Sequence, residues 1–149
     1  MRIGVEPGER VALWMTNRPE WLWVMFALGK IGACIVPLNT RHRTDDVAYT
    51  LSQSRSATMV TLDRSGPVDY QGMLMESMPE VRQSPDRTLT VERYSDLKRL
   101  VVLGERRLAH AHTWDALLAA GTSISDDPLA LRPGGRRQRV GGWHRARGR

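Results

Sequence analysis

Apolar and polar residues alternate in blocks along the first 128 residues, and these blocks predict strands and helices in turn. Nearly continuous apolar runs, typical of strands covered on both faces, occur at residues 10–15, 33–36, 57–62 and 99–103. Apolar residues spaced by three and four predict helices over residues 18–31, onward from 44, over 70–78 and over 113–120. This alternation predicts an α/β fold: a partial parallel sheet of right-handed βαβ units with helices on its faces.

Residues that commonly begin or end helices mark the predicted boundaries. Asn17 is the expected N-cap of the first helix, and Gly32 is its expected stop. Thr44 and Thr113 are the expected N-caps of the second and last helices, and Gly121 is the expected stop of the last one. The segment from residue 63 to residue 98 has weaker periodicity, and only the helix over 70–78 is predicted within it.

Net charge separates the chain into two parts. The chain carries +6 overall, but residues 129–149 hold seven arginines and no acid. Of the 22 basic residues, 15 therefore remain in residues 1–128 against 16 acids, a net charge of −1. We expect residues 1–128 to form the folded part, and the Arg/Gly-rich segment 129–149 to be a disordered basic tail.

The basic tail permits two interpretations. Its arginines, together with Trp143, are a composition that binds RNA through charge and stacking. The abrupt change of composition after Pro128 favours a second interpretation, in which a shift of reading frame produced the tail. Gly134-Gly135 followed by Arg136 and Arg137 suggests a phosphate site, but no strand–loop–helix context surrounds it, so a flexible tail is the better interpretation.

The order of short motifs in residues 4–128 resembles one family. The matching pieces are GVEPGERVA (4–12), NRPEW (17–21), KIGA (30–33), VPLN (36–39), the helix and strand over 44–63, the strand at 99–104, WDALLAAG (114–121) and DDP (126–128). Each piece has a structural task and is weak alone. In this order and spacing they resemble the opening of the N-terminal domain of AMP-forming acyl-CoA synthetases, the fatty-acid–CoA ligases and their adenylating relatives.

The resemblance implies an ATP-dependent ligation of an acid to CoA through an acyl-adenylate, with ATP, Mg²⁺ and CoA as cofactors of the intact family. In that family a Ser/Thr/Gly-rich loop that cradles ATP phosphates follows the DDP motif. Here residues 129–135 read LALRPGG instead. The resemblance therefore implies a truncated homologue, inactive alone, to which we assign no catalytic, cofactor-binding or metal-binding residue and no cofactor.

Several single residues are candidates for sites, and each also has a structural interpretation. Cys34 is expected to be a buried, inert thiol, because it lies in an apolar strand. Asp45 and Asp46 suit the positive end of a helix dipole, and Asn39 and Arg41 suit loop anchoring after a strand. The histidines are too scattered for a metal site; they are His42, His110, His112 and His144. Trp21 is assigned to the core, and Trp23, on the opposite helix face, to an exposed position or a contact with a neighbouring domain.

The composition of the chain also leads to expectations about its location and its partners. No run of 18 apolar residues and no signal peptide is visible, and a lone cysteine forms no internal disulfide, so a cytoplasmic location is the default expectation. Alternatives to an inactive ligase homologue are an unusual intact enzyme, a nucleic-acid-binding protein acting through its tail, and a non-catalytic partner of another ligase chain. An exposed sheet edge is expected to promote self-association or pairing with a ligase domain.

Overall fold

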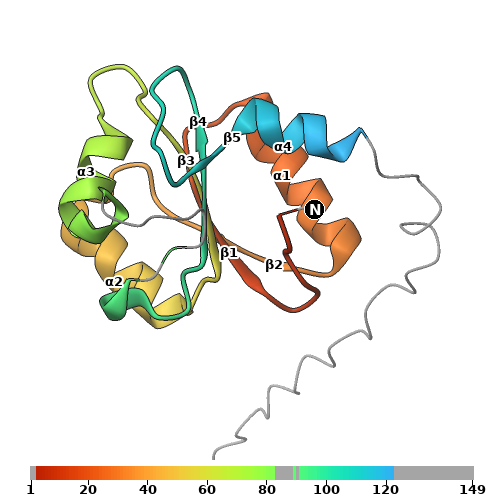
Figure 1. Ribbon diagram of the computed structural model, residues 1–149, viewed down its shortest axis with the longest axis horizontal. Coiled ribbons are helices and arrows are strands. Elements are labelled where there is room, and N and C mark those ends of the chain that lie inside the picture. The colour runs from red at the N-terminus through yellow and green to blue at the C-terminus, as the bar shows by residue number, and fades with distance from the viewer. Residues whose placement is uncertain (1–2, 83–88, 90, 123–149) are drawn as a thin grey trace, which may run out of the picture.

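Five parallel strands form one sheet at the centre of the computed structural model, which describes residues 3–82, 89 and 91–122 (Figure 1). The strands are β1 (Arg10–Trp14), β2 (Cys34–Pro37), β3 (Thr58–Leu62), β4 (Arg99–Leu103) and β5 (His112–Thr113). Their order across the sheet is β2-β1-β3-β4-β5, and every neighbouring pair is parallel. The predicted α/β class and parallel sheet are confirmed.

Four helices cover both faces of this sheet. They are α1 (Pro19–Ile31), α2 (Thr44–Ser54), α3 (Tyr70–Ser77) and α4 (Trp114–Gly121), with 3₁₀ turns at Pro79–Arg82 and Glu92–Tyr94. Helices α1 and α4 lie on one face, whereas α2 and α3 lie on the other (Figure 1). The right-handed crossover rule explains this division. The connection from β1 to β2 and the connection from β2 to β3 cross the sheet in opposite directions, so their helices α1 and α2 lie on opposite faces.

The core lies between the central strands and the two helix layers. Residues Val11 to Trp14 of β1 are fully buried, and all five residues of β3 are buried. The Trp14 ring meets Tyr70 of α3 edge to face, with centroids 4.8 Å apart and an interplanar angle of 77°. Continuous apolar strands are thus explained by helices on both faces of the central sheet.

Helix boundaries differ from the predictions by about one residue. Arg18, and not Asn17, is the N-cap of α1, and Arg43 is the N-cap of α2, with Thr44 as its first residue. Gly121 is the last residue of α4 instead of its stop. Thr113 is confirmed as an N-cap, because its Oγ1 accepts a hydrogen bond from the Ala116 amide at 3.2 Å.

Strand β5 is the one element of the sheet that the pattern did not predict. It contains only two residues, too few for an apolar or alternating run to be visible. It pairs with β4, and α4 begins directly after it. The predicted tail 129–149 lies outside the described residues.

Candidate functional site

Ligands of open α/β sheets bind at the carboxyl ends of the strands, where the chain reverses direction across the sheet. In this fold that point lies between β1 and β3, because β2 lies on one side of β1 and β3 lies on the other side. The loops after β1, β3 and β4 meet there, as do the first turns of α1 and α4. The carboxyl edge of the sheet is therefore the candidate site.

Asp63, directly after β3, is held by backbone amides of the loop after β4. Its carboxylate accepts hydrogen bonds from the amides of Glu105 at 2.9 Å and Arg106 at 3.0 Å, and from its neighbour Arg64. Burial alone would raise the pKa of Asp63, but these amides outweigh it and hold the pKa below its usual value. Asp63 is thus a charged residue that ties two loops together.

Gly104 makes this contact possible. It adopts φ +138°, and a Cβ at this position would lie 2.0 Å from the Asp63 carboxyl carbon. Only glycine leaves room for the carboxylate to reach the amides that follow. The sequence did contain a signal for this arrangement, namely an aspartate ending one strand and a glycine ending the next.

Arg106 links the same loops to the start of α3. Its guanidinium donates to the Asp63 carbonyl oxygen at 2.7 Å and to both carboxylate oxygens of Asp69. Asp69 is also the N-cap of α3, accepting from the Gly72 amide at 2.8 Å. Arg106, and then the Gly72 amide, lower the pKa of the Asp69 carboxyl from 3.8 to about 2. Asp69 is therefore ionised at neutral pH and unsuited to general acid–base chemistry.

A hollow of about 270 Å³ opens beside this network, between the first turns of α1 and α4. Two basic residues line it, Arg18 and Arg107, against three acids: Glu20, Glu105 and Asp115. Arg18 is paired with Glu20, because its guanidinium donates two hydrogen bonds of 2.7 Å to the Glu20 carboxylate. An acidic surplus and a paired arginine do not fit the phosphates of ATP, which need unpaired cationic groups and free amides.

Metal ligands are not gathered in the part of the chain that the structure describes. No three His, Cys, Asp or Glu side chains there come close enough to hold one ion. His112 lies in β5 and His42 in the loop before α2, whereas His144 falls outside the described residues. We derive no chemical step through a metal or a nucleotide.

The contacts of Asn39 and Asp46 fit the structural roles expected of them, whereas the position of Cys34 differs from the prediction. The Asn39 side chain accepts from the Arg41 amide at 2.9 Å, which anchors the loop after β2. Asp46 accepts from the Arg43 amide at 3.0 Å at the start of α2. The prediction of a buried Cys34 is wrong: this thiol is exposed. β2 is an edge strand, so its residues lack the neighbour that covers β1 and β3.

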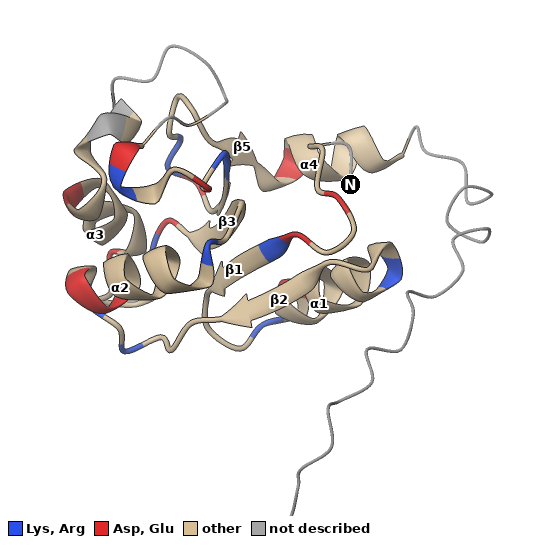
Figure 2. Cartoon of the chain, turned by 90° about the horizontal axis from the view of Figure 1, so that it is seen from below, with Lys and Arg blue, Asp and Glu red and all other residues tan. Residues whose placement is uncertain are grey.

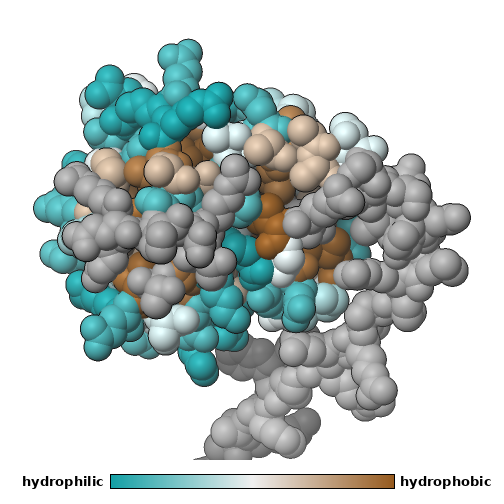
Figure 3. All heavy atoms as spheres, in the orientation of Figure 1, coloured by the Kyte–Doolittle hydropathy of each residue, from teal (hydrophilic) through white to brown (hydrophobic). Residues whose placement is uncertain are grey.

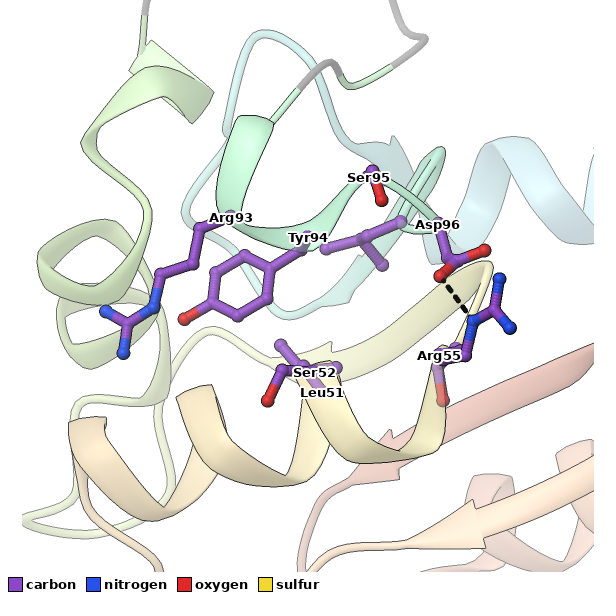
Figure 4. Close-up of a pocket in the computed structure, with 9 residues that line it drawn as sticks. Leu51, Ser52, Arg55, Arg93, Tyr94, Ser95 and Asp96 are labelled. Carbon is purple, nitrogen blue, oxygen red and sulfur yellow. Dashed lines mark hydrogen bonds and ion pairs between the residues drawn. The ribbon is translucent and has the colours of Figure 1, made fainter.

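A second pocket lies at the opposite, amino edge of the sheet, between α2 and the Glu92–Tyr94 turn (Figure 4). Its volume is about 230 Å³, and Arg55 and Arg93 both line it. Figure 4 shows the two guanidinium groups pointing away from each other, Arg55 toward Asp96 and Arg93 past the Tyr94 ring. Because the charges do not converge, this pocket is a weaker candidate than the carboxyl edge.

Comparison with known proteins agrees with the fold and the order of the motifs. Residues 1–128 match the family model described as AMP-binding enzyme. A Bacillus subtilis (strain 168) protein named as an acyl-CoA synthetase, YngI, is 34% identical over 132 residues, which cover 89% of this chain and 24% of that protein. The chain therefore belongs to the AMP-binding enzyme family, of which it represents an N-terminal portion spanning about a quarter of that relative's length.

Solved structures share the same fold. The N-terminal domain of FACL13 from Mycobacterium tuberculosis superposes with a TM-score of 0.58 at 22% identity, covering 90% of this chain and 27% of that one. The anthranilate CoA ligase AuaEII, in complex with anthranoyl-AMP, gives a TM-score of 0.62 at 22% identity, covering 80% of this chain and 20% of that one. At this identity the structures support the fold alone. Within the described residues no helix is long and apolar enough to cross a membrane.

Proposed function

We propose that this chain is a portion of an ATP-dependent, AMP-forming acyl-CoA ligase that does not adenylate an acid alone. The acid is a fatty acid or another hydrophobic carboxylic acid, and ATP, Mg²⁺ and CoA are the cofactors of the complete enzyme. A cytoplasmic location belongs to the same proposal. The observations that carry it are the family match over residues 1–128 and a separate alignment of 132 residues, which covers 24% of a relative named as an acyl-CoA synthetase.

The carboxyl edge supports a scaffolding role in such an enzyme. Adenylation needs cationic groups and amides aimed at the transferring phosphoryl group. Here the charged groups at that edge hold loops together: Arg106 pairs with Asp69, and the Asp63 carboxylate accepts hydrogen bonds from backbone amides after β4. The described residues thus position the strand ends and leave the chemistry to groups outside them.

Carboxylate-dependent exchange of pyrophosphate into ATP tests the first part of the proposal. The purified chain is assayed with a series of fatty and aromatic acids, and full-length YngI serves as the control for the assay. We expect no exchange above background from this chain. Acid-dependent exchange from it would show an adenylating enzyme and overturn the proposal.

A chimera tests the scaffolding part. Residues 1–128 of this chain replace the aligned region of YngI, and exchange activity is compared with that of YngI lacking the region. We expect the chimera to regain activity, because the replaced segment supplies the same sheet. A folded chimera with no exchange activity would contradict the assignment of residues 1–128 as a working ligase portion.

A further inference from the structure

Helix α1 is apolar around its whole circumference. From Trp21 to Gly29 it contains no charged residue, and Figure 2 shows it almost free of charge between its ends. Its inner face packs Val24, Leu28 and Ile31 against the sheet. A helix that is apolar on all sides is normally enclosed on all sides. Only one side of α1 is enclosed by the described residues.

The outer side of α1 joins α4 in one apolar surface, which we call the α1/α4 face. Its members are large side chains that are about half exposed or more: Leu22 (49%), Trp23 (55%) and Phe26 (64%) of α1, and Leu118 (49%) of α4. Trp23 stacks on Trp114 at the start of α4, with ring centroids 6.5 Å apart and an interplanar angle of 15°. Figure 3 shows hydrophobic side chains gathered over these helices.

The two helix layers differ in the surfaces that they present outward. Among the residues that the structure describes, five large hydrophobic side chains are exposed, and four of them belong to the α1/α4 face. The fifth, Tyr49, lies on α2 across the sheet, where Asp45 and Asp46 are also exposed. A mixed surface of that kind suits contact with water, whereas exposed apolar side chains that cluster mark a contact with another protein surface. The α1/α4 layer is therefore the side of the fold that lacks a cover.

A similar fold continues well beyond the part that this chain matches. The chain covers 27% of the N-terminal domain of FACL13, so most of that one domain lies outside the matched part. In this chain the described residues end at Thr122, directly after α4. A polypeptide that continues the fold therefore starts beside α4, where it can cover the outer sides of α4 and α1 without crossing the sheet. The fold thus favours the complementary portion of an AMP-binding enzyme as the occupant of the α1/α4 face.

Two other occupants suit this face less well. Residues 129–149 carry seven arginines, so burial of that segment on an apolar face would be costly. A membrane surface is disfavoured because α1 and α4 together have a single basic residue, Lys30, whereas helices that lie on membranes carry several.

We infer that this chain binds the complementary portion of an AMP-forming acyl-CoA ligase through the α1/α4 face when the two are separate polypeptides. The inference rests on the proposed function, because the partner is the part of such a ligase outside the region that this chain matches. Trp23 and Phe26 anchor the contact, since aromatic side chains carry much of the energy of protein interfaces. A hollow of about 290 Å³ at one end of the face receives a partner's side chain. It is lined by Asn17, Arg18, Trp21 and Leu22.

The open edge of the sheet is the competing surface for a ligase partner, but its sequence opposes pairing. The amides of Cys34 and Leu38 donate to the Glu9 and Leu13 carbonyls of the β1 segment. By alternation, positions 35 and 37 face outward, and Pro37 has no N–H to donate. A four-residue edge strand with an outward proline is a poor template for another strand.

Co-expression of the full chain, carrying an affinity tag, with YngI lacking the aligned region tests the inference. We expect the YngI portion to be soluble and to co-purify with the chain. Sedimentation velocity of the purified complex over a range of concentrations gives its dissociation constant. We expect this constant to rise about tenfold or more for Phe26→Glu and, independently, for Leu118→Glu on the other helix. Tyr49→Glu, 67% exposed on the opposite layer, is the matched control and is expected to leave the constant unchanged.

The covalent chimera of residues 1–128 with the same YngI portion separates this inference from the proposed function. If the chimera is folded and active but the separate chains do not associate, the inference is overturned and the proposed function stands. The same holds if the complex forms equally well with both Phe26→Glu and Leu118→Glu. Separate chains that associate through the α1/α4 face, together with an inactive chimera, would contradict the proposed function and support the inference. If the chimera is inactive and the separate chains do not associate, both fail.

Other occupants and other surfaces appear as distinct results, and each overturns the inference. Self-association of the chain alone that both face variants abolish, without binding of the YngI portion, would assign the face to a second copy. Binding to anionic vesicles with the same sensitivity would assign it to a membrane. A complex that Ile35→Lys abolishes while Phe26→Glu does not would place the contact at the sheet edge. Circular dichroism of each variant verifies folding, and two variants on separate helices keep the test valid if one of them fails to fold.

Discussion

Single residues at the carboxyl edge are constrained by contacts between segments far apart in the sequence. A hydrogen bond joins the Arg106 amide to the Asp63 carboxylate, although the two residues are 43 positions apart in the sequence. Residue types alone identified Asp63 as the end of a strand, but the pairing requires β3 and β4 to be neighbours in a fixed register. The arrangement therefore depends on tertiary structure, and it yields two predictions at the scale of residues.

Gly104→Ala is expected to destabilise the fold. The new Cβ would overlap the Asp63 carboxylate, and the φ of +138° is strained for any side chain, at a cost of roughly 1–3 kcal/mol for the backbone alone. Thermal unfolding followed by circular dichroism measures the loss. Gly121→Ala, at the exposed end of α4 with nothing near its Cβ position, is the control and is expected to leave the melting temperature unchanged or slightly raised.

Asp69 is expected to contribute to acid sensitivity. Its pKa is lowered from 3.8 in the unfolded chain to about 2 in the fold, so its contribution is complete above pH 3.8 and is lost as the pH falls toward 2. Asp69→Asn keeps a good N-cap but removes the charge. Urea unfolding at pH 7 and at successively lower pH should show a smaller loss of stability between pH 4 and 2 in the variant. Equal losses in both proteins would contradict this role.

At the scale of elements, the helices and most strands follow from the sequence because each carries a long apolar signal. β4 was predicted with its observed bounds, and α1 within one residue at its start. β5 was missed because a two-residue strand is defined by its neighbour β4 and by nothing in its own composition. Cys34 was misplaced for a related reason: an apolar run indicates a strand but not whether it lies at the edge.

Two leucines of α1 allow the enclosed and the open side of one helix to be compared. Leu28 is 1% exposed, so Leu28→Ala is expected to cost about 2–5 kcal/mol of unfolding free energy. Leu22 is 49% exposed, so Leu22→Ala is expected to change stability by less than about 1 kcal/mol when measured in dilute solution. Chemical denaturation at low protein concentration provides both values. Similar losses at the two positions would mean that the outer face of α1 is covered within a single copy.

At the scale of the whole molecule, the sequence predicted the class and the family but not the surface. The α/β alternation and the ordered motifs were sufficient for the fold, because each motif marks a turn or a helix end that the fold requires. Trp23 was assigned to an exposed position or a domain contact, and it is 55% exposed and stacked on Trp114. The joining of α1 with α4 was not visible in the sequence, since 90 residues separate the two helices' tryptophans and only the sheet brings them together.

The strand order also has a consequence for biosynthesis. β1 is the first strand to leave the ribosome, yet its neighbours are β2 and β3, and Val11 is paired with Thr58. One side of β1 therefore remains unpaired until the nascent chain has extended past residue 62. Non-local parallel pairing of this kind slows folding and prolongs the exposure of apolar segments. Until then, the apolar run from Val11 to Trp14 has one open strand edge, a feature of the partly folded chains that chaperones protect from aggregation.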